Sequence, residues 1–129
     1  MASFDRISTA NAAPAAGPYS QAVKISPSSS WIFTSGQLPA EADGTLRLDD
    51  PIGEQTHRCI KNLAAILEAA GSSLDKVIKT TVFITDMKNF AEVNGVYEQY
   101  FTQKPARSCV AVKELPKGAP VEIECIALA

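Results

Sequence analysis

The sequence is poor in the residues that build disulfide frameworks and metal centres. It contains three cysteines, Cys59, Cys109 and Cys125, and one histidine, His57. The cysteines are odd in number, far apart in the chain and form no Cys-x-x-Cys pair, which excludes a disulfide scaffold and favours a reducing compartment. No second ligand lies near His57 in the sequence, so we expect no zinc or other metal site.

Long apolar runs and an excess of basic residues are also absent. No stretch approaches the roughly 18 apolar residues of a membrane-spanning helix. The 12 Lys and Arg against 14 Asp and Glu argue against nucleic acid as the primary partner. The first residues lack the apolar core of a secretory signal. The Ala- and Ser-rich residues after them leave a mitochondrial location open, whereas the single Arg and an early Asp favour the cytoplasm.

The composition is that of one ordinary globular domain. With 129 residues, 46% of them hydrophobic and 20% charged, the chain is long enough to bury a single core. We expect one domain over residues 1–129. Residues 1–18 are rich in Ala, Pro and Ser, show little periodicity and end in Gly17-Pro18, which predicts an extended N-terminal arm.

Alternating and helical apolar patterns predict seven elements in the order β-β-α-β-α-β-β. The helices are indicated by apolar residues at three- and four-residue spacing, from Cys59 to Ala70 before Gly71 and from Phe90 to Phe101 before Pro105, with Asp86 or Asn89 as the start of the second. The predicted strands are Tyr19–Ile25, Trp31–Ser35, Val77–Ile84, Arg107–Val112 and Val121–Leu128.

This order indicates an α+β fold with one mixed sheet, a hairpin at each end and both helices on one face. Both sides of the strand at residues 77–84 are partly apolar, which places it in the centre of the sheet. A sheet covered on one face leaves the other face bare. Apolar residues there would need cover, most simply from further copies of the chain, so we expect a homo-oligomer.

Arg107 is the first candidate for a functional residue. On a strand, Arg107, Cys109 and Ala111 point to one side and Ser108, Val110 and Val112 to the other; the second set resembles a core, so the first is expected to face a cleft or interface. A guanidinium binds a carboxylate through two parallel hydrogen bonds. The alternative is a structural ion pair with Glu122 or Glu124, and the spacing alone leaves both interpretations open.

Several other side chains are candidates for the same site. Glu122 and Glu124 share a strand face, where mutual repulsion favours a protonated form and suits proton transfer. Tyr19 follows Gly-Pro, Asn94 lies beside an apolar helix stripe, and Ser35-Gly36 leaves a strand with exposed backbone N–H groups that suit an anion. Cys109 as a nucleophile would need His57 as its base, and the helix position of His57 makes that pairing unexpected.

Five blocks of sequence, in order and in register, resemble the Rid (YjgF-type) family. They are Gly17-Pro18-Tyr19-Ser20-Gln21-Ala22, Thr34-Ser35-Gly36-Gln37-Leu38-Pro39, Lys79-Thr80-Thr81-Val82-Phe83, Val93-Asn94-x-x-Tyr97, and Pro105-Ala106-Arg107-Ser108-Cys109-Val110 with the following Leu115-Pro116 and Val121-Glu122-Ile123-Glu124. The resemblance covers nearly the whole chain.

The resemblance implies a chorismate-mutase-like fold and a homotrimer with a central barrel, outer helices and active sites between subunits. Active members of the family are hydrolases that deaminate enamines and imines such as 2-aminoacrylate and 2-aminocrotonate, giving 2-oxo acids and ammonia without cofactor or metal. By matching position, Arg107 would bind the substrate carboxylate and Glu122 would activate water. Tyr19, Ser35, Gly36, Asn94 and Cys109 would line the pocket.

Two other functions are weighed against this one. The first is a non-catalytic trimer that binds small carboxylates in the same clefts and acts as a regulator. The second is RNA cleavage or translation inhibition, which is attributed to eukaryotic relatives. The acidic charge balance, the single histidine and the lack of a basic aromatic stripe argue against the second.

Overall fold

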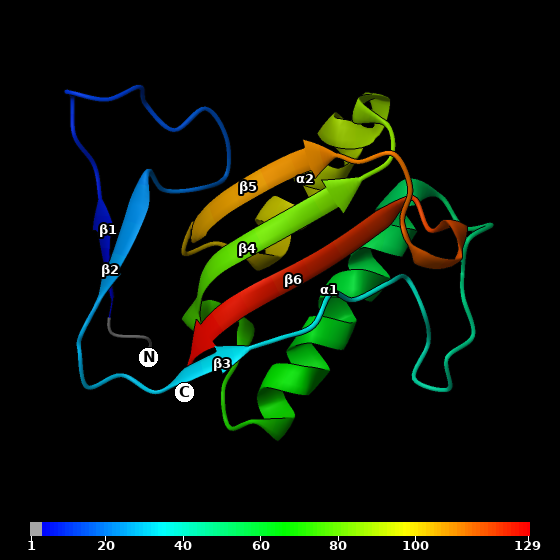
Figure 1. Ribbon diagram of the computed structural model, residues 1–129, viewed down its shortest axis with the longest axis horizontal. Helices are drawn as coiled ribbons and strands as arrows, with labels where there is room; N and C mark the ends of the chain where they lie inside the picture. The colour runs from blue at the N-terminus through cyan, green and yellow to red at the C-terminus, as the bar shows by residue number, and fades with distance from the viewer. Residues whose placement is uncertain (1–3) are drawn as a thin grey trace.

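A four-stranded sheet with two helices on one side forms the body of the molecule (Figure 1). The computed structural model describes residues 4–129. Its strands are β1 (Phe4–Ile7), β2 (Ala22–Ile25), β3 (Trp31–Phe33), β4 (Val77–Ile84), β5 (Ala106–Ala111) and β6 (Val121–Leu128), and its helices are α1 (Ile52–Ala69) and α2 (Phe90–Tyr100).

The first helix follows its apolar stripe. Its residues Cys59, Ile60, Leu63 and Leu67 are fully buried against the sheet, and Lys61 between them is exposed. Gly71 follows with a φ of 81°, a left-handed conformation that glycine adopts without a steric penalty. The predicted helix is confirmed, although it begins at Ile52, and Ile66 and Ala70 of the predicted apolar stripe are exposed.

The second helix begins at Phe90 and ends at Tyr100, before Pro105. Of the two predicted starting residues, Asp86 accepts a hydrogen bond from the backbone N–H of Lys88 at 3.0 Å and so caps the short turn that precedes α2. Asn89 directly precedes the helix and makes no side-chain capping bond.

The sheet order is β3-β6-β4-β5, and β4 lies in its centre as predicted. It runs parallel to β5 and antiparallel to β6. A parallel neighbour requires a crossover, and α2 provides it between β4 and β5. The predicted hairpin between residues 107–112 and 121–128 is therefore wrong, because β5 and β6 do not pair with each other. The buried strand β4 lies between them and pairs with β5 along one edge and with β6 along the other.

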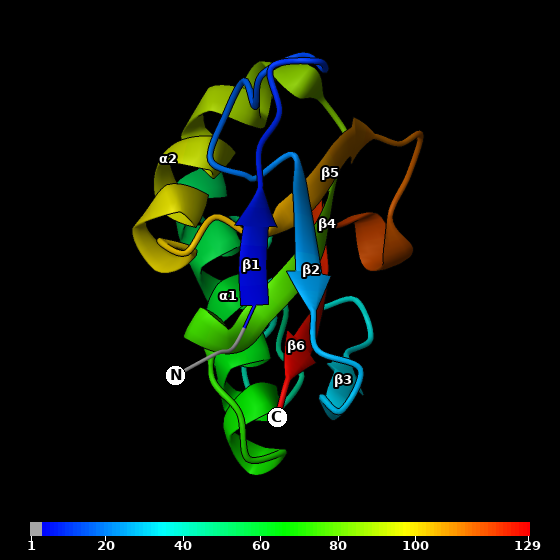
Figure 2. The ribbon, with the colours of Figure 1, turned by 90° about the vertical axis from the view of Figure 1, so that its left-hand side faces the viewer.

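The predicted N-terminal hairpin is also wrong. Residues 22–25 pair with β1, from the arm that was expected to be merely extended, and β3 pairs with β6 (Figure 2). The connection at residues 26–30 holds a proline and four serines, none of which favours the tight two-residue turn of a short hairpin. The result is a separate two-stranded sheet beside the main one, not a single sheet.

Both helices cover the same face of the main sheet, as expected for this α+β fold (Figures 1 and 2). The core between the helices and the sheet consists of Cys59, Ile60, Leu63, Leu67, Val77, Val82, Ile84, Val93, Tyr97, Phe101, Val121, Ile123, Cys125 and Ala127. The opposite face is bare and partly apolar, with Trp31 52%, Phe33 65% and Val110 43% exposed. Among the described residues, no helix is both long and apolar enough to cross a membrane.

Candidate functional site

Arg107 is enclosed by aromatic rings on the helix side of the sheet. Its Nη1 donates to the Asn94 Oδ1 at 2.6 Å. Its Cζ lies 4.9 Å from the centroid of the Tyr97 ring, 5.7 Å from that of Tyr19 and 5.8 Å from that of Phe90. The ring faces attract the cation and hold its plane in place. The resulting group, Tyr19, Phe90, Asn94, Tyr97 and Arg107, is referred to below as the arginine cage.

No carboxylate forms an ion pair with Arg107 anywhere in residues 4–129. The pairing with Glu122 or Glu124, left open by the sequence, is excluded within one chain by the register. Arg107 is opposite Thr80, a fully buried residue on the helix side of β4, whereas Glu122 is opposite Phe83 on the other face. Within the described part of the chain, the guanidinium therefore has no carboxylate beside it.

The predicted orientation of the side chains of β5 needs one correction, which concerns Ser108 and Val110. Ser108 and Val110 were expected to point into the core, but both are exposed on the bare face of the sheet. Arg107 and Cys109 face the helices, and Cys109 packs against the core. The small apolar side chains of this edge strand fit an uncovered face as well as a core, so the pattern alone could not separate the two.

The N-terminal arm brings Tyr19 to Arg107. The Ser20 hydroxyl donates to the Lys104 carbonyl at 2.5 Å, and its backbone N–H donates to the Pro105 carbonyl at 3.3 Å. A Cβ added at Gly17 would lie 3.5 Å from the Arg107 Nη2 and 3.3 Å from the Tyr19 ring. The chain at position 17 thus passes beside the guanidinium, at a distance where a Cβ would make an ordinary van der Waals contact with it.

Tyr97 is the one member of the cage that is fully buried. Its hydroxyl bonds the Thr80 Oγ1 at 2.6 Å, and burial raises the pKa of the phenol to about 12, against the opposing effects of Thr80 and Arg107. The sequence placed Tyr97 only in the apolar stripe of the helix. Its spacing of three residues from Asn94 was the available signal that both face Arg107.

Cys109 lies on the same strand face as Arg107 and is half-buried. Burial raises the pKa of its thiol, and the nearby Arg107 charge only partly opposes this. A thiol held in its neutral form is a poor nucleophile. His57, the base that a cysteine nucleophile would need, hydrogen-bonds Tyr100 between the two helices. Cys109 is thus poorly suited to act as a nucleophile with His57 as its base.

Glu122 and Glu124 lie together on the bare face of the sheet. Burial raises the pKa of the Glu122 carboxyl, and the Glu124 charge raises it further. A Cβ added at Gly36 would lie 2.0 Å from the Glu122 Oε2 and 2.7 Å from its carboxyl carbon. Only glycine therefore allows the backbone at position 36 to approach this carboxylate so closely.

The pairing register between the chain and β6 shifts by one residue within residues 34–37. Phe33 is opposite Ile126, whereas Gln37 exchanges two backbone hydrogen bonds with Ile123, at 2.8 and 3.1 Å. Ser35 and Gly36 together are therefore opposite the single residue Glu124. Such an extra residue is a β-bulge, a feature that redirects the chain at the edge of a ladder. Within the described residues, neither backbone N–H of this Ser35–Gly36 bulge donates a hydrogen bond.

The predicted site residues thus form two groups. Tyr19, Asn94, Arg107 and Cys109 meet on the helix side of the sheet, while Ser35, Gly36 and Glu122 meet on its bare face. One chain does not bring the two groups together. Phe90 and Gly17 belong to the first group and were not predicted, because an apolar helix residue and a turn glycine are ordinary structural features.

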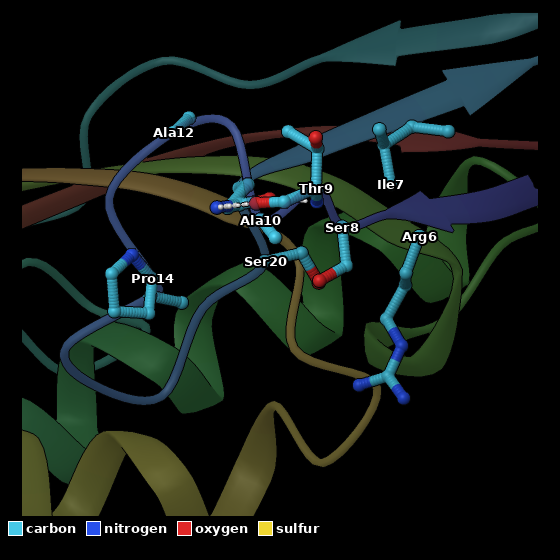
Figure 3. A pocket seen from close by; sticks show the side chains of 10 residues that line it. Arg6, Ile7, Ser8, Thr9, Ala10, Ala12, Pro14 and Ser20 are labelled. Carbon is cyan, nitrogen blue, oxygen red and sulfur yellow. Dashed lines mark hydrogen bonds between the residues drawn. The ribbon is translucent and has the colours of Figure 1, made fainter.

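A separate cavity of about 700 Å³ lies under the N-terminal arm, away from both groups (Figure 3). Gln21 closes it by accepting from the Thr9 N–H at 2.6 Å and donating to the Ala13 carbonyl at 2.7 Å. Its lining is mostly the loop's own small residues, and the side chain of Arg6 points away from Ala12. No predicted site residue lines it. Among residues 4–129, no three His, Cys, Asp or Glu side chains cluster as metal ligands.

Comparison with known proteins gives consistent matches over nearly the full chain. The profile of a family described as Endoribonuclease L-PSP matches residues 9–129. The 2-iminobutanoate/2-iminopropanoate deaminase of Salmonella typhimurium is 43% identical over 126 residues, which is 95% of this chain and 95% of that protein. YyfA of Yersinia pestis, described as a Rid family protein of unknown function, is 45% identical with a TM-score of 0.73, covering 98% and 100% of the two chains. The crystal structure of E. coli TdcF with bound serine is 41% identical with a TM-score of 0.72, covering 97% and 98%.

Proposed function

The chain belongs to the Rid (YjgF-type, Endoribonuclease L-PSP) family, and from this we propose that it hydrolyses reactive 2-imino and 2-enamino acids, such as 2-aminoacrylate and 2-aminocrotonate, to 2-oxo acids and ammonia. The observation that carries the proposal is the arginine cage. It holds a cation in a defined orientation with no carboxylate of its own, which is an arrangement suited to a small anionic ligand.

Arg107 would bind the substrate carboxylate. Asn94 occupies Nη1 at 2.6 Å, and the N–H groups of Nη2 and Nε remain for two parallel hydrogen bonds to a ligand. Serine, the molecule bound in the similar E. coli TdcF, also carries an α-carboxylate. Fixing this end of the substrate holds the adjacent C=N carbon still, and such orientation contributes a large share of many enzymatic rate enhancements.

Glu122 would act on the attacking water. Its raised pKa makes it a stronger base than an ordinary glutamate once ionised, and the backbone of Gly36 passes close to its carboxyl. Water adds to the carbon of the protonated C=N group as Glu122 accepts one of its protons, which gives a neutral carbinolamine. Glu122 then returns this proton to the nitrogen, ammonia leaves, and the hydroxyl proton is lost as the C=O bond of the 2-oxo acid forms. Tyr19 and Cys109 would line the pocket.

The two halves of this site face opposite sides of one sheet, so a complete site requires two copies of the chain. The bare face with Trp31, Phe33 and Val110 provides a surface for such contacts. We propose a homotrimer in which the uncovered faces meet around a central axis and Arg107 of one subunit approaches Glu122 of the next. The small molecules bound at this site would be the imine substrate and its 2-oxo acid product.

The test is release of 2-oxo acid from 2-aminoacrylate generated in the assay, followed for the wild type, Arg107→Ala and Arg47→Ala. Loss of two charge-assisted hydrogen bonds should lower kcat/KM about a hundredfold or more in Arg107→Ala. Arg47 pairs with Asp50 at 3.3 Å on an exposed loop, so its replacement is a matched control that should leave the rate unchanged. Equal rates in all three proteins would contradict the role of Arg107.

The alternative functions give different outcomes in the same preparation. Binding of a 2-oxo acid without any imine turnover would favour a non-catalytic regulatory trimer. A ribonuclease activity that co-purifies with the protein and is retained by the Arg107→Ala variant would favour a nuclease. The proposed deaminase predicts imine turnover that depends on Arg107, and no RNA cleavage.

A further inference from the structure

The hydroxyl of Thr34 replaces a backbone carbonyl in the ladder between β3 and β6. The Thr34 N–H donates to the Cys125 carbonyl at 3.0 Å, as in a regular antiparallel pair. In such a pair the Cys125 N–H would donate in return to the Thr34 carbonyl. Instead it donates to the Thr34 Oγ1 at 3.0 Å. The hydroxyl lies 3.3 Å from the Cys125 carbonyl, to which it donates its own proton.

This substitution is what allows the bulge to begin at residue 35. The backbone carbonyl of Thr34 is released from the ladder, and the chain gains one residue before Gln37 rejoins Ile123. If the Cys125 N–H bonded the Thr34 carbonyl, the register would continue and pair Ser35 with Glu124. Gly36 would then be opposite Ile123, and a one-residue change of register turns each side chain to the other face of the sheet.

Resting on the proposed function, we propose that Thr34 is a positioning residue for the reaction: its hydroxyl sets the Ser35–Gly36 bulge, and the bulge holds the Glu122 carboxylate in place. Thr34 does not contact the substrate. It acts through Gly36, whose backbone approaches the Glu122 carboxyl so closely that a Cβ there would be 2.0 Å from Oε2. The Gly36 backbone thus borders the space that the carboxylate occupies, and a shift of the bulge changes that space.

Three variants separate this role from simple loss of a buried hydroxyl. Thr34→Val keeps the side-chain shape and removes the acceptor for the Cys125 N–H, whereas Thr34→Ser keeps the acceptor. Thr56→Val is the matched control, because the fully buried Thr56 donates its hydroxyl to the Ile52 carbonyl at 2.8 Å inside α1, on the other side of the core.

Each variant is measured by imine turnover, by thermal unfolding and by NMR titration of the Glu122 carboxyl carbon. In Thr34→Val we expect kcat to fall by up to about a hundredfold, the effect of misplacing a reacting group by ~1 Å, with a smaller change in KM. The pKa of Glu122 should move down toward its ordinary value, because the carboxylate is less covered. Thr34→Ser should retain both wild-type values. Thr56→Val should lose stability but keep the wild-type kcat and Glu122 titration.

A Thr34→Val protein with wild-type kcat and wild-type Glu122 titration would overturn the proposal, as would the same changes in Thr56→Val. If Thr34→Val does not fold, NMR scalar couplings across hydrogen bonds in the wild-type protein provide the test. We expect a coupling from the Thr34 amide nitrogen to the Cys125 carbonyl carbon. A coupling from the Cys125 amide nitrogen to the Thr34 carbonyl carbon would overturn the proposal. Absence of imine turnover by the wild type would instead contradict the proposed deaminase activity, and the titration and the couplings would still test Thr34.

Discussion

Arg107 and Glu122 project from opposite faces of the same sheet. Arg107 on β5 is opposite the buried Thr80, and Glu122 on β6 is opposite Phe83, which lies on the bare face. Within residues 4–129 no carboxylate pairs with Arg107, and the pKa of Glu122 is raised. Because we propose that Arg107 binds the substrate and Glu122 activates water, their separation has direct consequences for experiment.

Mixing two inactive variants should restore activity if each site takes Arg107 from one subunit and Glu122 from another. Arg107→Ala and Glu122→Gln, unfolded and refolded together in equal amounts, should recover about a quarter of wild-type activity, because random assembly makes that fraction of interfaces intact on both sides. Each variant refolded alone is the control. A mixture no more active than its components would show that one chain supplies both residues.

The activity should depend on pH through Glu122. If Glu122 must be ionised to accept a proton, kcat/KM falls as the pH drops through its pKa, and burial together with Glu124 raises that pKa above the ordinary 4.5. Glu124→Gln should move this acid limb to lower pH, since it removes the second cause. Glu98→Gln, an exposed change on α2, should leave the limb in place. An acid limb at the same pH in Glu124→Gln as in the wild type would argue that Glu122 ionisation does not cause it.

The same group predicts a pH-dependent change in stability. Folding raises the pKa of Glu122, so the folded protein holds the proton more tightly, and the stability contributed by this group falls as the pH rises through both pKa values. Glu122→Gln should therefore be more stable than the wild type at neutral pH. The difference should shrink below pH 4.5, where both states are protonated. Denaturant unfolding at fixed protein concentration and several pH values measures it.

Gly36→Ala and Gly95→Ala should differ sharply, although both replace a glycine by alanine. The Cβ at position 36 would be 2.0 Å from the Glu122 Oε2, so the carboxylate must move and kcat/KM should fall by about a hundredfold. A Cβ at position 95 in α2 meets nothing within 4 Å, and the change should stabilise the helix by ~0.5–1 kcal/mol without loss of activity. Steady-state kinetics and unfolding on both proteins provide the comparison.

The Thr80–Tyr97 hydroxyl pair should contribute to stability as a unit. Tyr97→Phe or Thr80→Val leaves a buried hydroxyl without its partner and should cost about 1–3 kcal/mol. The double variant should cost less than the sum of the two, because it removes both polar groups. Tyr97→Phe should keep its activity, since the ring that lies 4.9 Å from the Arg107 Cζ remains. Strictly additive losses would show that the two hydroxyls are not coupled.

The sequence predicted the helices and the central strand because those patterns are local. The buried stripe of α1 and the left-handed Gly71 depend on neighbouring residues, and the apolar character of β4 on both faces required a central position. Strand partners depend on distant residues. Nothing within residues 22–25 indicates that they pair with β1 and not with β3, and nothing in β6 indicates that it pairs with β4 and β3.

The site residues were predicted individually, but their grouping was not. Arg107, Asn94 and Tyr19 meet because α2 and the arm both reach the start of β5, a relationship set by the crossover and by the hydrogen bonds of Ser20. The exposed side of β5 was misassigned, since Val110 fits a core as well as an uncovered face. Within the sequence, only Ser35-Gly36 marks the position of the bulge. The bulge itself could not be predicted, because its register depends on how two distant strands pair.

The unpaired charge of Arg107 links folding to the supply of small carboxylates. A ligand that binds the folded protein alone raises its stability by RT ln(1 + [L]/Kd), which is ~2.7 kcal/mol at a hundredfold excess over Kd. Because residues 4–129 of one chain place no carboxylate beside the guanidinium, a 2-oxo acid product would contribute its charge without displacing an ion pair of that chain. Resistance to heat and to proteolysis would then rise with the 2-oxo acid pool, and the lifetime of the protein would follow the metabolic flux through the proposed reaction.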